Sequence, residues 1–155
     1  MSSSTPPSMS ARDLEAFLHE KIPLSRAMGV AIGPSEPGQL VLEAPLAPNI
    51  NHLGTAFGGS LHALPTLACY TAVWKLLCTE GLNGHVVVKH SEANYRQPVK
   101  GRLRARCTLP SQDDATKFLT DLRRHKKARM TLSAIVEGID GKPAVEFSGI
   151  FVAII

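Results

Sequence analysis

The chain has 155 residues, of which 44% are hydrophobic and 19% are charged, as is usual for one globular domain with a single core. Its formal net charge of +4 favours an anionic partner. Aromatic residues make up only 5%, too few for a surface that binds single strands by stacking, so we expect no nucleic-acid partner.

The first ten residues, MSSSTPPSMS, are rich in Ser and Pro and show no apolar period. We expect a flexible tail over residues 1–10, followed by a single domain over residues 11–155. A signal peptide would need a charged start and an apolar stretch, and this segment has neither. Three cysteines, Cys69, Cys78 and Cys107, form no CxxC pair and suit a reducing cytoplasm. We therefore expect a cytoplasmic protein without a membrane segment.

The first half of the chain predicts two helices and a hairpin. Apolar residues recur at helical spacing over residues 11–21 and predict a short amphipathic helix. Two short apolar or alternating runs, residues 28–32 and 39–44, predict the hairpin. Residues 57–79 are apolar on nearly every face, which predicts a long helix enclosed by the rest of the protein, with a kink at Pro65.

The second half predicts four strands and one more helix. Residues 86–99 and 103–109 read as strands, and Ser111 begins an amphipathic helix as its N-cap. The last two strands alternate strictly and meet at Asp140-Gly141, a strong two-residue hairpin turn. This order of elements predicts an α+β fold with an antiparallel sheet.

The start of the long helix is the most informative segment. Gly54, Gly58 and Gly59 give this helix an entrance without Cβ atoms, where a ligand can approach the backbone. The first N–H groups of a helix have no internal partner, and the helix dipole adds about half a positive charge there. Such an end can stabilise the oxyanion that develops in acyl transfer. A tight turn that only lets the helix pack against a strand is the alternative.

Residues 49–70, NINHLGTAFGGSLHALPTLACY, and Tyr95-Arg96-Gln97-Pro98 at the end of a strand resemble the hot-dog thioesterases. The resemblance is closest to the branch also found fused behind GNAT-type acetyltransferases. It covers residues 12–155, so we expect no acetyltransferase domain here. The resemblance implies a hot-dog fold, in which an antiparallel sheet of about six strands wraps around one long buried helix. It also implies a homodimer, or a dimer of dimers, that binds acyl-CoA at its interface.

The resemblance assigns roles to residues around the diglycine. It implies that Gly58 or Gly59 supplies the oxyanion N–H and that Asn51 positions the thioester or the attacking water. Many relatives carry His before the diglycine and an acidic residue seven positions after it, and these positions hold Phe57 and Thr66 here. A hydroxyl is a very weak base, so Thr66 would orient a water at most. It would equally suit a bond back to the helix backbone.

Other candidate bases lie on the strand that follows the long helix. Period-two alternation places four residues on one face of this strand: Val88, His90, Glu92 and Asn94. We rank Glu92 and His90 ahead of His62, which lies one turn into the helix. For each of them, a solvated or hydrogen-bonded structural role is the alternative.

The candidates for substrate binding are Thr55, Phe57, Ser60 and His62 near the diglycine, with Arg102 and Arg104 on a later strand. Ser60 lacks the GxSxG context of a nucleophile and suits a helix N-cap. The arginines alternate on one face, where they would bind the phosphates of CoA or the acidic surface of an acyl carrier protein, or simply protect a solvated strand edge.

Two functions remain open. The chain is an acyl-CoA or acyl-carrier-protein thioesterase, or it is a non-catalytic acyl-thioester binder on the same fold. No His or Cys spacing suits a metal. We expect no cofactor, since coenzyme A would be part of the substrate.

Overall fold

The computed structural model describes residues 9–155. Residues 1–8 of the expected tail lie outside the described residues. Ser10 belongs to the domain, because its hydroxyl accepts a hydrogen bond from the amide of Asp13 and so caps the first helix. This helix buries Leu14 and Leu18 and exposes most of its charged side chains, as its apolar spacing predicts.

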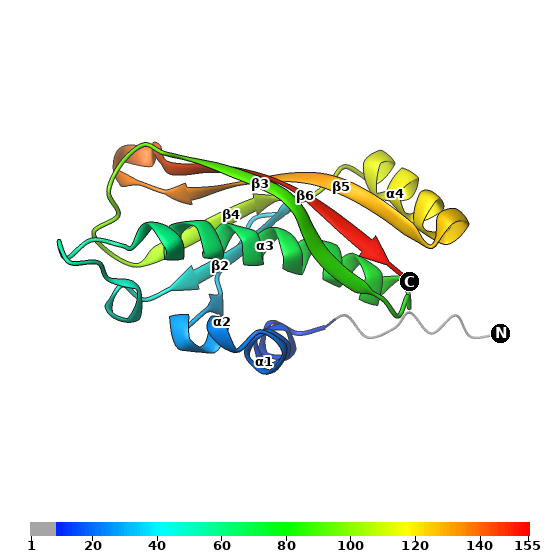
Figure 1. Ribbon diagram of the computed structural model, residues 1–155, viewed down its shortest axis with the longest axis horizontal. Coiled ribbons are helices and arrows are strands. Elements are labelled where there is room, and N and C mark those ends of the chain that lie inside the picture. Colours follow the sequence, from blue (N-terminus) through cyan, green and yellow to red (C-terminus); the bar gives the residue numbers. More distant parts are fainter. Residues whose placement is uncertain (1–8) are drawn as a thin grey trace.

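Residues 9–155 form one antiparallel sheet and four helices (Figure 1). The helices are α1 (Ala11–Lys21), α2 (Pro23–Met28), α3 (Gly58–Thr79) and α4 (Gln112–His125), with short 3-10 turns at Ala47–Asn49 and Ile139–Gly141. The strands are β1 (Ala31–Ile32), β2 (Gln39–Ala44), β3 (His85–Tyr95), β4 (Leu103–Thr108), β5 (Lys127–Glu137) and β6 (Pro143–Ile154). Their order in the sheet is β1-β2-β4-β5-β6-β3. The predicted α+β hot-dog architecture, six antiparallel strands around one long helix, is confirmed.

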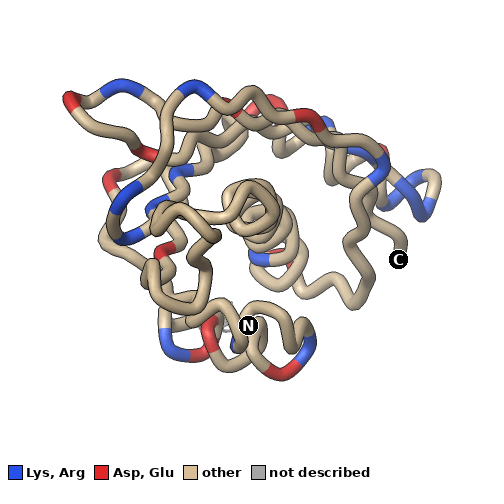
Figure 2. The backbone as a smooth tube through the Cα atoms, turned by 60° about the vertical axis from the view of Figure 1, so that its left-hand side comes forward, with Lys and Arg blue, Asp and Glu red and all other residues tan. Residues whose placement is uncertain are grey.

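α3 lies in the centre of the molecule, between the sheet on one side and α1 with α2 on the other (Figure 2). Leu64, Ala68 and Cys69 are fully buried, and the helix continues through Pro65. A stacked pair, Phe17 and Trp74, packs α1 against α3 with ring centroids 3.7 Å apart. Among the described residues, no helix combines the length and the apolarity that crossing a membrane requires.

The first hairpin differs from the prediction. Pro23 begins a helix, α2, instead of only ending the previous one, since its fixed φ suits the first turn. Gly29 ends α2 with a φ of 73°, a left-handed conformation that glycine adopts at little cost. The expected strand over residues 28–32 is therefore reduced to Ala31–Ile32.

β3 also differs, in its length and in its register. It ends at Tyr95 rather than at residue 99, and it lies at the edge of the sheet with β6 as its one neighbour. Val88 pairs with Phe151 and His90 with Ile150, so Lys89 is an extra residue in a bulge. A bulge of one residue reverses the side-chain alternation of the rest of the strand.

The local signals in the last third of the chain are confirmed. Ser111 caps α4 by accepting a hydrogen bond from the amide of Asp114 at 3.1 Å. Asp140 and Gly141 both adopt positive φ, 60° and 71°, as the predicted turn between β5 and β6 requires.

Candidate active site

The loop before α3 is shaped by the side chain of Asn51. Its Oδ1 accepts hydrogen bonds from the amides of Leu53 (2.9 Å) and Thr55 (3.0 Å). Its Nδ2 donates to Thr55 Oγ1 (2.8 Å) and to the carbonyl of Ala56 (3.4 Å). Both ends of the amide are therefore used inside the loop, and Thr55 is one of the partners. Asn51 positions the chain that enters α3.

Two further hydrogen bonds fix the direction in which α3 begins. The amide of Ala56 donates to the carbonyl of Val99, and the amide of Phe57 donates to the carbonyl of Asn49, each at 2.8 Å. Asn49 itself is 2% exposed, and its Nδ2 donates to the carbonyls of Met28 and Pro45. The sequence analysis did not single out Asn49, and only its position between apolar neighbours could have indicated a buried amide.

The first turn of α3 presents free amide groups. Phe57 is the N-cap and its side chain makes no capping bond. Within residues 9–155, the amides of Gly58, Gly59 and Ser60 have no acceptor, and Gly59 is exposed. Ser60 is thus not the N-cap that its sequence suggested, because the helix begins two residues earlier. The helix dipole adds positive potential at this turn, so it can stabilise an anionic oxygen.

Two side-chain hydrogen bonds, one helical turn apart, connect α3 to β3. The hydroxyl of Tyr95 donates to the carbonyl of Gly58 at 3.3 Å. One turn further, Nε2 of His62 lies 3.0 Å from Oγ of Ser91. Residues four apart share a face of a helix, so Gly58, His62 and then Thr66 form a row toward β3. We call this row, with Ser91 and Tyr95, the α3–β3 seam.

Thr66 is used within its own helix. Its hydroxyl donates to the carbonyl of His62 at 2.8 Å, in the pattern that threonine often adopts inside helices. The side chain is half-buried. The position where the resemblance implies an acidic residue therefore holds a group that is bonded to the backbone.

His90 and Glu92 do not join the seam. They flank Ser91, which contacts His62 on the inner side of the sheet, so both project from the outer face. The prediction that Val88 shares a face with His90 and Glu92 is therefore wrong. The bulge at Lys89 places Val88 on the inner side of the sheet and His90 with Glu92 on the outer side. Their exposed side chains lie away from the diglycine. Of the three candidate bases, His62 is the one that the structure places on the seam, one turn from Gly58.

Two pockets of about 340 Å³ each flank the start of α3. The first lies between α2 and α3 and is mainly apolar, with Leu24, Phe57 and Ala63 among its lining residues. The second is more polar and lies between the loop and the end of β3; it is lined by Asn51, Thr55 and Gly58 and by residues 95–98.

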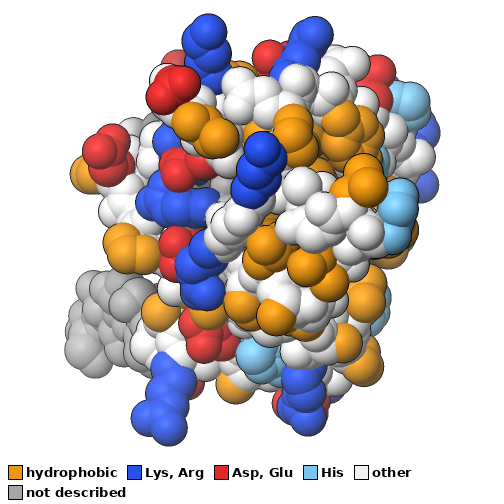
Figure 3. All heavy atoms as spheres, turned by 90° about the vertical axis from the view of Figure 1, so that its left-hand side faces the viewer, with side chains coloured by type: hydrophobic (Ala, Val, Ile, Leu, Met, Phe, Trp, Pro, Cys, Tyr) orange, Lys and Arg blue, Asp and Glu red, His pale blue; other side chains and the backbone are white. Residues whose placement is uncertain are grey.

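Phe57 lines the first of these pockets. Its side chain is 56% exposed, and its ring lies so close to Gly59 that a Cβ there would overlap it. Apolar side chains gather at this end of the molecule (Figure 3). The exposed ones include Leu53 and Tyr95.

The arginines at the start of β4 and within it already have partners. Arg102 lies 3.4 Å from Glu43 on β2, and Arg104 pairs with both Glu43 and Glu137. Arg106 also contacts Glu137, at 2.9 Å. These ion pairs cross-link β2, β4 and β5 on one face of the sheet. The ion pairs therefore engage these arginines within the sheet, and phosphate binding by Arg102 and Arg104 stays a prediction.

Comparison with known proteins supports an assignment to a family. The family described as "Putative thioesterase (yiiD_Cterm)" matches residues 11–155. A protein of unknown function from Chlorobaculum tepidum is 32% identical, with 99% of each chain covered and a TM-score of 0.90. A "putative thioesterase" from Shewanella oneidensis is 30% identical, with 94% of this chain and 97% of that chain covered and a TM-score of 0.83.

A more distant structure shares the fold alone. A thioesterase from Haemophilus influenzae is 13% identical, with 96% of this chain and 93% of that chain covered and a TM-score of 0.71. The family match covers nearly the whole chain, and its arrangement of six strands around α3 is the one that the resemblance implied. This protein belongs to that family of hot-dog thioesterases.

Proposed function

We propose that the protein hydrolyses an acyl thioester, carried by coenzyme A or by an acyl carrier protein, at the start of α3. The family and its structural relatives support thioester hydrolysis in general. The observation that carries the proposal is the juxtaposition of free amides at Gly58 and Gly59 with His62, one turn along the α3–β3 seam.

The reaction would proceed by attack of water on the thioester carbonyl. The carbonyl oxygen becomes negative as the new C–O bond forms, and the amides of Gly58 and Gly59 stabilise this charge. His62 accepts a proton from the water and then donates it to the thiolate as the C–S bond breaks. Ser91 holds the imidazole ring in place, and the edge of the ring packs on Phe147. The products are a carboxylic acid and a free thiol.

The two pockets suit the two halves of such a substrate. The apolar pocket beside Leu24 and Phe57 suits the acyl group. The less apolar pocket beside Asn51 and Thr55 suits the amide-containing arm that bears the sulfur. The two pockets lie on either side of the diglycine, since Gly59 lines the first pocket and Gly58 lines the second. A thioester carbonyl between them would lie at the free amides.

We also propose that the protein acts in the cytoplasm as a homodimer, or a dimer of dimers, built on the free edge of β3. This edge strand has 11 residues and exposes Val87, Val88 and Tyr95. Long apolar edges are usually covered in native proteins, and a two-fold pair of β3 strands would cover this one. Light scattering should give a mass at least twice the 16.7 kDa of one chain, and a monomer at micromolar concentration would contradict the dimer.

A non-catalytic acyl-thioester binder remains the second candidate, and one observation favours it. Thr66 occupies the position where many relatives carry an acid, and its hydroxyl is bonded to the helix backbone. Whether the protein hydrolyses the thioester or only binds it then depends on whether His62 alone can activate the attacking water.

A panel of fatty and aromatic acyl-CoA thioesters tests both candidates. The free thiol that is released is followed with a chromogenic thiol reagent. Catalytic release above the rate without protein supports the hydrolase. Saturable binding of the same thioesters without release would support the binder and contradict the proposed hydrolysis.

A further inference from the structure

A second concave surface lies on the outer face of the sheet, away from the α3–β3 seam. It is a groove of about 920 Å³ between α4 and strands β3, β5 and β6. Side chains of three neighbouring strands form its floor. Arg129 pairs with Val152, and Val152 pairs with Val87, so the three lie side by side on one face of the sheet. The apolar part of the floor consists of Val87, Val152 and Ile154.

Cations from three elements surround this floor. They are Lys89 on β3, Lys117 on α4, and Lys127 and Arg129 on β5. All four are exposed, and none forms an ion pair within residues 9–155. His125 lies beside them, and Asp121 is the one carboxylate that lines the groove. We call this surface the basic groove.

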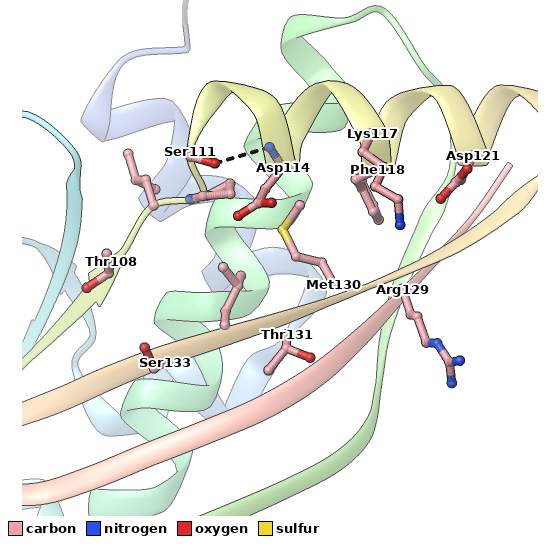
Figure 4. A pocket seen from close by; sticks show the side chains of 13 residues that line it. Thr108, Ser111, Asp114, Lys117, Phe118, Asp121, Arg129, Met130, Thr131 and Ser133 are labelled. Carbon is pink, nitrogen blue, oxygen red and sulfur yellow. Dashed lines mark hydrogen bonds between the residues drawn. The ribbon is translucent and has the colours of Figure 1, made fainter.

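The basic groove continues along α4 into a neighbouring pocket, and the two share Lys117, Asp121 and Arg129 (Figure 4). Lys117 and Asp121 project from α4 toward β5. Lys and Arg also gather where α4 ends, close to the C-terminus (Figure 2). The outer face thus carries unpaired positive charge, whereas the arginines of β4 are neutralised by glutamates.

We infer that the basic groove docks an acidic, amphipathic helix of a protein that carries the acyl thioester. Its cations stand on three separate elements around an apolar floor, and only one of them is an arginine. A single phosphate is more often held by bidentate arginines or by clustered amides. Separated charges around valine and isoleucine side chains match an acidic helix that also presents apolar residues.

This inference rests on the proposed function and on the proposed dimer. Within one protomer, the basic groove contacts β3 at Val87 and Lys89, and Gly58 contacts it at Tyr95, roughly 20–26 Å further along the strand. In an antiparallel pair of β3 edges, the start of one strand lies beside the end of the other. A carrier protein docked on one protomer would then deliver its thioester to the partner's diglycine.

The test compares one acyl group on two carriers, coenzyme A and a bacterial acyl carrier protein. The variant K127E/R129E reverses two charges of the basic groove. The control R12E/K142E makes the same change in charge at two exposed positions outside it. We expect K127E/R129E to raise KM for the acyl carrier protein by roughly tenfold, since several exposed charge contacts are reversed. The control variant should leave this KM within about twofold of wild type.

Hydrolysis of the acyl-CoA by K127E/R129E shows whether the basic groove docks the carrier protein or binds coenzyme A itself. It should change less than about twofold in K127E/R129E, because the basic groove would not contact coenzyme A. Equal losses with both carriers would mean that the basic groove binds the phosphates of coenzyme A and would overturn the inference. Unchanged KM for the carrier protein, or an equal loss in R12E/K142E, would overturn it too.

A binding measurement keeps the inference independent of catalysis. If wild-type protein hydrolyses neither substrate, the proposed hydrolysis fails, yet docking can still be measured by calorimetry. The probe is the carrier protein loaded with a non-hydrolysable amide analogue. Roughly tenfold weaker binding to K127E/R129E than to wild type supports docking. Equal or undetectable binding to both proteins contradicts it.

Discussion

Nε2 of His62 on α3 lies 3.0 Å from Oγ of Ser91 on β3, one helical turn from the carbonyl of Gly58 that the hydroxyl of Tyr95 contacts. This pair fixes an imidazole on the inner side of the sheet, one helical turn from the free amides at the start of α3. Neither residue has a charged neighbour among its hydrogen-bond partners in residues 9–155. The reactivity of His62 would therefore be set by its contacts with Ser91 and Phe147.

Replacing His62 with Ala should reduce thioester hydrolysis by about 100- to 10,000-fold, the range for loss of a general base. Ser91→Ala should have a smaller effect, because it frees the ring without removing it. Rates and melting temperatures are measured for both variants, together with the pH dependence of kcat/KM. A folded His62→Ala protein with full activity would exclude His62 as the base, and Glu92→Gln and His90→Ala would then be examined.

Gly59→Val should abolish most of the activity and leave the fold intact. The new side chain would displace the ring of Phe57, which is exposed and can move, and it would cover the amide of residue 59. Loss of one oxyanion donor costs about 100- to 1,000-fold in turnover. Gly101→Ala, where an added Cβ meets nothing within 4 Å, is the control for a harmless glycine replacement. Undiminished turnover in a folded Gly59→Val protein would refute the oxyanion assignment.

Asn51→Ala should destabilise the fold by about 0.5–2 kcal/mol, because four hydrogen bonds that shape the loop are lost. Asn51→Asp keeps the two acceptor bonds to the amides of Leu53 and Thr55 and should cost less. Denaturant unfolding measures both variants, and their turnover is measured in parallel. Full stability combined with lost turnover would instead indicate direct contact between Asn51 and the substrate.

The fold was predictable from the sequence because its signals are local. The apolar run of α3, the Ser111 cap and the Asp140-Gly141 turn each depend on a few neighbouring residues. The position of the glycines at the start of α3 was predictable for the same reason. The structure adds what surrounds them, namely the loop that Asn51 shapes and the amides without acceptors.

The orientation of the candidate bases was not predictable in this way. One extra residue, Lys89, turns His90 and Glu92 to the outer face, and a bulge of this kind has no clear sequence signature. The ion pairs of Arg104 were not predictable because its partners lie on neighbouring strands. Period two gives the face of a strand but does not show that Glu43 and Glu137 stand opposite.

Stability should fall with rising pH because of Cys69. The hydrogen bond with Cys107, followed by burial, raises the pKa of the Cys69 thiol far above its ordinary value of 9.0. Above about pH 9, the thiol ionises in the unfolded protein but stays protonated in the native protein. The contribution of Cys69 to the free energy of unfolding is therefore complete below about pH 9 and decreases above it. The free energy of unfolding should fall by up to about 1.4 kcal/mol per pH unit there.

Denaturant unfolding at about pH 8 and about pH 10 measures this slope, with Cys69→Ala as the variant that lacks the ionisable group. Cys78 and Tyr70 also have raised pKa values, both mainly through burial, so part of the slope should remain. An unchanged slope in Cys69→Ala would show that Cys69 does not contribute.

Thr66→Asp should raise hydrolysis if the native protein is slow. The new carboxylate would lie one turn from His62 on the seam, at the position where many relatives carry their acid, and could activate the attacking water. The site is half-buried, so a charged group there has a desolvation cost, and folding is checked first by melting. Thr66→Asn has nearly the same shape without the charge and is the matched control. Equal rates in folded Thr66→Asp and Thr66→Asn would mean that a carboxylate at this position does not reach the thioester, and the catalytic geometry proposed around Gly58 and Gly59 would be wrong.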